Sequence, residues 1–159
     1  MNQFIKKLII ENKIKLVEPS LEICESYLDK SSKSLTSSKT LYKIGNFDDA
    51  TALTYYSMYY SLLALLFKCG IKSQNHTGSI ILLKELFDFE NKEIKESKKE
   101  RLDKQYYIDF KSTKEDVKIG IDIAEKFNIK ILEKIDLIRI EEINNIRNNF
   151  IKRYLMKEN

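Results

Sequence analysis

Few side chains in this sequence of 159 residues can exchange protons near neutral pH. His76 is the only histidine, and its imidazole has the ordinary pKa closest to 7. Two interpretations of His76 stay open at this point. It is either a residue at a helix start that satisfies local partners, or a pocket residue that shares a site with Lys72 and Arg101. Arg101 can likewise be an ordinary surface cation in a highly charged segment.

The sequence does not contain the motifs of other common catalytic or binding sites. We find no Gly-rich phosphate loop, no pair of catalytic carboxylates and no nucleophile motif. Cys24 and Cys69 have no metal-ligand or Cys-x-x-Cys spacing, and suit small core residues in a reducing compartment. We therefore expect no metal and no cofactor. The net charge of +4, with acidic residues spread among basic ones, is typical of a solvated helical surface and only weakly indicates nucleic acid.

A central helix over residues 46–70 organises the elements that must position these side chains. Asn46 suits the N-cap, and Gly70 can take the left-handed conformation that ends a helix. Apolar residues cover two adjoining faces, so the helix must pack on two sides. That apolar surface exceeds what a small bundle covers, and we expect a homodimer. We expect its four tyrosines to make core or dimer contacts rather than to stack on nucleic-acid bases. They are Tyr55, Tyr56, Tyr59 and Tyr60.

The predicted fold class is all-α: an up-and-down bundle of five to six helices with a long central helical hairpin. Four Gly and one Pro are too few for the turns of a β-sandwich or barrel. A helix over residues 20–44 pairs with the central helix, and Gly45 at the bend should adopt a positive φ or allow close backbone passage. Residues 1–19 and 136–159 are predicted as helical extensions of a bundle over residues 20–135.

Further helices are predicted around the hairpin, over residues 2–15, 79–89 and 94–107. The charged run 91–99 is interpreted as a mobile connection because it offers almost no apolar surface. Thr113 begins the last helix with an acidic residue three positions later, as in a capping box. Its helical pattern continues almost to the C-terminus, with a kink near Asn128.

Membrane association is not expected. The longest apolar run, residues 62–67, is far below the ~20 residues of a membrane-spanning helix, and the N-terminal run is too short for a signal peptide. The sequence therefore predicts a cytoplasmic protein.

Residues along the chain match a known family pattern in the right order. They are Gly45-Asn46-Phe47 at the bend, Ala50, Tyr55, Tyr56, Met58 and Tyr59 on the central helix, Lys72 and His76 in the next loop, and Arg101 with Tyr106-Tyr107 beyond. With this pattern the chain resembles the prokaryotic HEPN family over roughly residues 20–135. The resemblance implies a dimerising helical bundle, often encoded beside a minimal nucleotidyltransferase as a toxin–antitoxin pair.

The resemblance also implies a chemistry. Family members with nuclease activity cut RNA with an Arg and a His roughly four to six residues apart, the His exchanging protons and the Arg stabilising charge on the phosphate. Here the residue five positions after Arg101 is Tyr106, and a phenol with a reference pKa of about 10 is a poor base at pH 7. The catalytic candidates are therefore Arg101, Tyr106 and His76. The candidates for binding nucleotide or RNA are Lys72, Arg101 and Tyr107.

We thus predict a toxin-like or partner component of a nucleotidyltransferase pair that binds nucleotide or RNA. Weak metal-independent cleavage of RNA would follow if His76 lies beside Arg101, within one chain or across a dimer. The alternative is a non-catalytic helical module for dimerisation or interaction. The bend also resembles a tetratricopeptide hairpin, but no second copy occurs at a period of about 34 residues.

Overall fold

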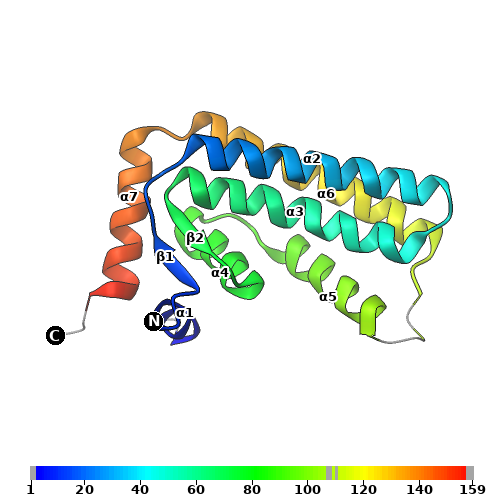
Figure 1. Ribbon diagram of the computed structural model, residues 1–159, viewed down its shortest axis with the longest axis horizontal. Coiled ribbons are helices and arrows are strands. Elements are labelled where there is room, and N and C mark those ends of the chain that lie inside the picture. Colours follow the sequence, from blue (N-terminus) through cyan, green and yellow to red (C-terminus); the bar gives the residue numbers. More distant parts are fainter. Residues whose placement is uncertain (1–2, 107–108, 110, 157–159) are drawn as a thin grey trace.

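A hairpin of two long helices forms the centre of the all-α bundle in the computed structural model (Figure 1). The structure describes residues 3–106, 109 and 111–156. Its elements are α1 (Gln3–Ile10), β1 (Ile14–Leu16), α2 (Leu21–Lys43), α3 (Phe47–Lys68), β2 (Ile71–Ser73), α4 (His76–Phe87), α5 (Lys92–Tyr106), α6 (Lys114–Leu137), α7 (Ile140–Phe150) and a π-helical turn, η1 (Ile151–Leu155). The predicted fold class is confirmed, although these residues form seven α-helices rather than five to six. None of the helices in this part of the chain is long and apolar enough to cross a bilayer.

The hairpin of α2 and α3 follows from its caps and its small residues. Ser20 begins α2 by accepting a hydrogen bond from the Ile23 amide (3.1 Å). Gly45 has the predicted positive φ, +82°, but a Cβ there would meet nothing within 4 Å, so the alternative of close backbone passage is wrong. Ser31 donates to the Ser57 carbonyl oxygen on the facing helix (2.8 Å). Such small hydroxyl residues let the two helices approach closely while their own buried hydroxyl groups stay hydrogen-bonded.

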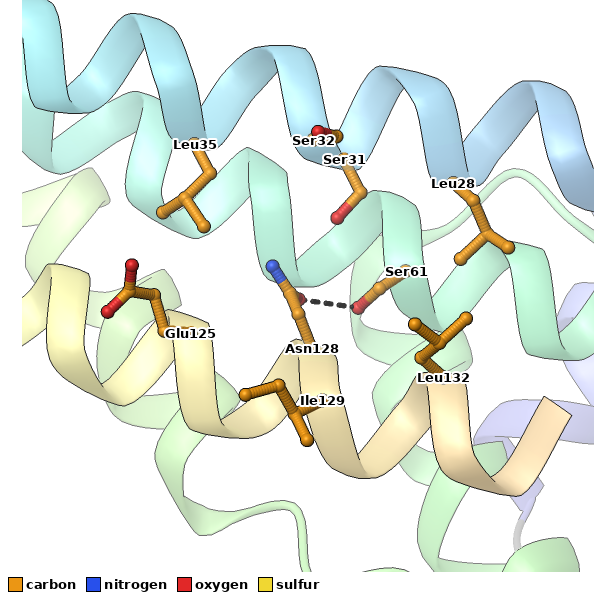
Figure 2. A pocket seen from close by; sticks show the side chains of 9 residues that line it. All are labelled: Leu28, Ser31, Ser32, Leu35, Ser61, Glu125, Asn128, Ile129 and Leu132. Carbon is orange, nitrogen blue, oxygen red and sulfur yellow. Dashed lines mark hydrogen bonds between the residues drawn. The ribbon is translucent and has the colours of Figure 1, made fainter. Parts of the chain in front are cut away.

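Helix α6 closes the other side of α3 through a polar contact. Asn128 Nδ2 donates to the Ser57 hydroxyl (2.7 Å), and the Ser61 hydroxyl donates to Asn128 Oδ1 (2.8 Å; Figure 2). Helix α6 continues through Asn128, where the sequence predicts a kink, and the side chain of Asn128 ties α6 to α3. With α2, α5 and α6 packed around it, α3 is covered within a single chain, and its apolar faces are not free for a second copy.

A two-stranded antiparallel sheet lies at one end of the hairpin, where the sequence predicted only a helix and a loop. β1 and β2 pair Ile14 with Ser73 and Leu16 with Ile71. The predicted helix over residues 2–15 ends at Ile10 instead, and Asn12 with φ +57° turns the chain into β1. Strands of three residues form here only because a distant segment pairs with them, so no local pattern indicates them.

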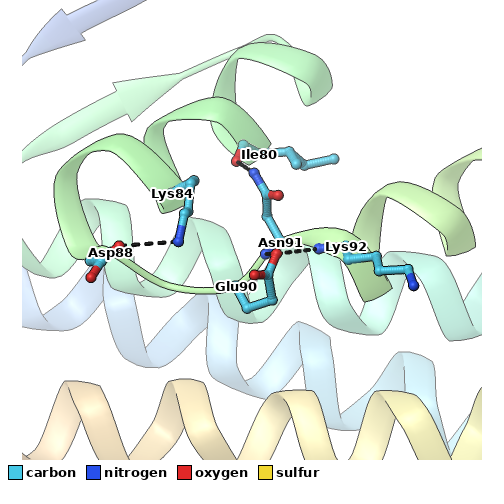
Figure 3. Close-up of polar contacts among 6 residues, drawn as sticks. All are labelled: Ile80, Lys84, Asp88, Glu90, Asn91 and Lys92. Carbon is cyan, nitrogen blue, oxygen red and sulfur yellow. Dashed lines mark hydrogen bonds and ion pairs between the residues drawn. The ribbon is translucent and has the colours of Figure 1, made fainter.

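The connection from α4 to α5 is ordered by a buried asparagine (Figure 3). Asn91 is 5% exposed, and its Nδ2 donates to the Ile80 carbonyl oxygen (2.9 Å). Glu90 Oε1 accepts from the Asn91 and Lys92 amides (2.9 and 3.3 Å), which begins α5. The interpretation of residues 91–99 as a mobile connection is therefore wrong. They form the first half of a helix fixed beside α4.

The last predicted helix is two helices. Its capping box is confirmed, since Thr113 Oγ1 accepts from the Asp116 amide (3.1 Å) while the Asp116 carboxylate accepts from the Thr113 amide (2.9 Å). Ile138 is extended, with φ −66° and ψ +125°, and so ends α6. An ion pair of Lys134 with Glu142 (2.6 Å) spans the break. No Pro or Gly marks this break.

Arg147 on α7 holds the C-terminal end of α3. Its Nη1 donates to the carbonyl oxygens of Val17 (2.7 Å), Cys69 (3.1 Å) and Gly70 (3.1 Å). A cation is favoured there because the last carbonyl groups of a helix carry partial negative charge. Gly70 has the predicted positive φ, +69°. We call this contact the Arg147 clamp.

Candidate functional site

His76 is positioned by the start of α4. Asn75 Oδ1 accepts from the Gly78 amide (2.8 Å) and so caps the helix at its first residue, His76. The imidazole is directed onto α3, where its Nδ1 lies 2.6 Å from the Tyr55 hydroxyl. Its ring stacks on Tyr59, with ring centroids 3.9 Å apart and planes 10° apart. His76 is thus both a helix-start residue and a member of an aromatic cluster.

Arg101 on α5 reaches the same tyrosines. Its Nη1 donates to the Tyr56 hydroxyl and to Gln105 Oε1, both at 3.1 Å. The guanidinium carbon lies 5.4 Å from the ring centroids of Tyr55 and of Tyr56. Arg101 Nε is buried, and no described residue accepts its hydrogen bond. Buried donors normally have partners, so this N–H group is a candidate for an acceptor that is not among the described residues.

The structure therefore brings His76 and Arg101 together within one chain, through Tyr55. We call Tyr55, Tyr56, His76 and Arg101 the Tyr–His–Arg cluster. Burial, and then the charges of Arg101 and Lys98, lower the pKa of His76 to about 4. Burial raises the pKa of Tyr55. At neutral pH the cluster thus holds a neutral imidazole at His76 and a protonated phenol at Tyr55, beside the Arg101 guanidinium.

The hydrogen bond of Tyr55 decides what His76 can do. An imidazole nitrogen is a better acceptor than a phenol oxygen, so we assign the Tyr55 hydroxyl as donor to His76 Nδ1. The imidazole proton then lies on Nε2. In this tautomer the basic lone pair is occupied, and the cluster offers N–H groups to an anion rather than a free proton acceptor.

Arg101 also opens onto a hollow of about 380 Å³ beside α3. Lys104, Gln105 and Tyr56 line it, together with two carboxylates. Both carboxylates are engaged: Asp48 accepts from the Ser112 amide (2.7 Å), and Asp49 accepts from the Asn46 side chain (2.7 Å). The hollow therefore contains two cations, Arg101 and Lys104, and two carboxylates that already accept hydrogen bonds.

Neither Tyr106 nor Lys72 forms a hydrogen bond with a residue of the cluster. Tyr106 ends α5, is 69% exposed and makes no hydrogen bond or ring contact with another described residue. It lies about 140° around the helix from Arg101, because five residues turn an α-helix by that much beyond one full turn. Lys72 is paired with Lys15 in the sheet and has no ion pair within the described ranges. Tyr107 lies outside the described residues.

Sequence reasoning missed Tyr55 and Tyr56 as members of the site, since it assigned them to the core or to a dimer. Tyr55 is indeed fully buried, but its hydroxyl binds His76. A usable signal existed, because a buried tyrosine hydroxyl needs a polar partner and apolar neighbours on the same helix cannot supply one. Lys98, which also lowers the pKa of His76, was missed as well.

The pKa of His76 supports a direct test. We predict that its imidazole titrates by NMR with a midpoint near pH 4 instead of 6.5. Between pH 4 and 6.5 the unfolded chain binds a proton at His76 and the folded chain does not. The contribution of His76 to the free energy of unfolding is therefore largest above pH 6.5 and is lost as the pH falls toward 4. His76→Gln should lack this part of the pH dependence of unfolding. A midpoint at pH 6 or above would contradict the contacts described.

The residues described contain no group of three or more His, Cys, Asp and Glu side chains that could hold a metal ion. A family model for the HEPN domain matches residues 24–135, which is more than half of the chain. A comparison with curated proteins found no match. The matched range extends from α2 to α6 and contains all four residues of the Tyr–His–Arg cluster.

Proposed function

The chain belongs to the HEPN family, and from this premise we propose that it binds RNA or nucleotide through a phosphate at the Tyr–His–Arg cluster. One observation carries the proposal: no described residue accepts a hydrogen bond from the buried Nε of Arg101, which shares the cluster with a neutral imidazole. A phosphate oxygen would accept from Arg101, and a second one from His76 Nε2. Charge-assisted hydrogen bonds of this kind are among the strongest that a protein offers an anion.

Binding is favoured over cleavage by the state of His76. Cleavage through the ribose 2′-OH needs a group that takes up a proton in the transition state. His76 has its Nδ1 bonded to Tyr55 and a pKa of about 4, so it is a weak base at pH 7. A weak metal-independent ribonuclease is the second candidate function, and the contact of both His76 and Arg101 with Tyr55 favours it.

A paired assay tests this proposal. We predict that a fluorescently labelled RNA oligonucleotide binds saturably by anisotropy, while denaturing gels in EDTA show no cleavage above background. His76→Gln should leave that background unchanged. Robust cleavage in EDTA that both His76→Gln and Arg101→Ala abolish would establish the nuclease instead. Absence of both binding and cleavage would favour a non-catalytic interaction module.

We further propose a minimal nucleotidyltransferase as the partner in a toxin–antitoxin pair acting in the cytoplasm. Membership of the HEPN family supports this proposal. The test is the neighbouring reading frame and its product. Co-expression should yield a stable complex of the two proteins on size exclusion, and separate elution at micromolar concentration would count against the pair.

A homodimer is proposed on a surface other than α3. An apolar hollow of about 530 Å³ lies between α2 and α6, lined by Leu28, Leu35, Ile129 and Leu132 (Figure 2). Ile129 and Leu132 are 56% and 44% exposed, so this face still has apolar surface to bury.

Light scattering tests the dimer. We predict a mass of twice the 18.8 kDa of the chain at micromolar concentration and physiological salt. Ile129→Lys should shift the protein to monomer because it places a charge in the contact. Ile119→Lys is the matched control, since Ile119 also lies on α6, is 50% exposed and does not line the hollow. A monomeric wild-type protein would overturn the proposal.

A further inference from the structure

A groove of about 370 Å³ runs between α4 and α5, next to the Tyr–His–Arg cluster. Its floor is apolar and its rim is basic. Ile80, Ile81 and Leu102 form the apolar part, and the three lysines of the groove are Lys95, Lys98 and Lys99. We call it the α4–α5 groove.

The three lysines of this groove have no ion-pair partner among the described carboxylates, whereas Lys92 on the same helix pairs with Glu96 at 3.9 Å. Asp103 is the one acidic residue among those that line the groove. Lys98 donates to the Thr77 hydroxyl (2.6 Å), and burial together with Arg101 lowers its pKa. Unpaired and partly desolvated cations attract an anion more strongly than fully hydrated ones.

The groove is continuous with the cluster through two pairs of neighbours. Thr77 follows His76 on α4, and Lys98 precedes Arg101 by about one turn on α5. Lys95 and Arg101 are six residues apart, which at about 1.5 Å and about 100° per residue is about 9 Å along the helix and about 120° around it. A single phosphate group is too small to contact both, so the basic surface suits two phosphates of one ligand.

We propose that the α4–α5 groove binds the nucleotide next to the one held at the Tyr–His–Arg cluster. The phosphate of this second nucleotide lies on the lysines of the rim, and its base lies on the apolar floor. This inference rests on the proposed function and narrows its ligand to single-stranded RNA of at least two nucleotides. A single strand is required because bases stacked in a duplex cannot reach an apolar floor.

The experiment compares uridine 5′-monophosphate with the 5′-phosphorylated dinucleotide pUpU. Wild-type protein should bind pUpU at least about tenfold more tightly than the mononucleotide, since the dinucleotide adds one phosphate contact and one base contact. The variant Lys95→Gln/Lys99→Gln should bind the mononucleotide with the affinity of the wild type. Its affinity for pUpU should exceed its affinity for the mononucleotide by less than threefold. Lys98 is left in place because it contacts Thr77.

A matched control separates the groove from a general effect of charge. Lys126→Gln/Lys130→Gln removes two exposed lysines at the same spacing from α6 and should retain the full gain for pUpU. For pUpU, the slope of log Kd against log salt concentration should be about 0.7 smaller in the groove variant than in the wild type. In the control variant this slope should stay unchanged.

The outcomes distinguish the two proposals. An undiminished gain for pUpU in the groove variant, or an equal loss in the control, overturns the groove while the proposed function stands. A pUpU analogue without its second base that binds as tightly as pUpU overturns the role of the apolar floor. Failure of the wild-type protein to bind either probe or any longer RNA overturns the proposed function, and the groove proposal with it.

Discussion

Gly70→Ala is expected to lower the free energy of unfolding by about 3–5 kcal/mol, through backbone strain and overpacking together. A Cβ at this position would lie 2.1 Å from Arg147 Nη1 and 2.4 Å from the Val17 carbonyl oxygen. The φ of +69° is also unfavourable for any residue with a Cβ. To make room, the Arg147 clamp must open, which leaves a partly buried guanidinium with fewer acceptors.

Gly45→Ala is the matched control for this prediction. Gly45 has a similar φ of +82°, but an added Cβ there meets nothing within 4 Å. Backbone strain alone should cost about 1 kcal/mol. Urea denaturation of both variants measures the difference. Equal losses of stability would show that the clamp relaxes freely and that strain explains both substitutions.

Arg101→Ala is expected to weaken RNA binding by roughly 10- to 100-fold. This range follows because a hydrogen bond to a charged group contributes about 1.5–3 kcal/mol. Arg101→Lys should recover only part of the affinity, because an ammonium keeps the charge but cannot reproduce the planar set of guanidinium donors. Anisotropy titrations at fixed salt measure both variants, with thermal melts to verify folding.

The control for Arg101 is Arg139→Ala, which removes the same charge from an exposed position at the start of α7. Its affinity for RNA should stay within twofold of the wild-type value. An Arg101→Ala variant that binds RNA within threefold of wild type would remove Arg101 from the phosphate contact, and the Tyr–His–Arg cluster would then be a feature of the core.

Local signals predicted much of the fold. Thr113 caps α6 as predicted, and Gly45 and Gly70 have positive φ values, because capping and left-handed turns depend on a few adjacent residues. Asn46 takes the predicted N-cap position of α3, but its side chain makes no capping hydrogen bond. The pairing of β1 with β2 could not be predicted in this way. Each strand has three residues and depends on a partner more than 50 positions away.

The site was predicted only in part, for a related reason. His76 and Arg101 stood out by residue type, but the hydroxyl groups that join them come from α3, which is apolar enough to be interpreted as pure core. Their contact also depends on α5 lying against α4. Asn91 secures that position with a single buried hydrogen bond in a segment whose charged composition indicates a loop.

The Arg147 clamp also sets an order of events during synthesis on the ribosome. Arg147 and Val17 are separated by 130 residues. At roughly 5–20 residues per second, Arg147 is added on the order of ten seconds after Val17. From the addition of Lys68, the last residue of α3, until that of Arg147, α2 and α3 can already pair, whereas the carbonyl groups at the end of α3 lack their cation. The hairpin of the nascent chain can therefore form before the Arg147 clamp closes the end beside the small sheet.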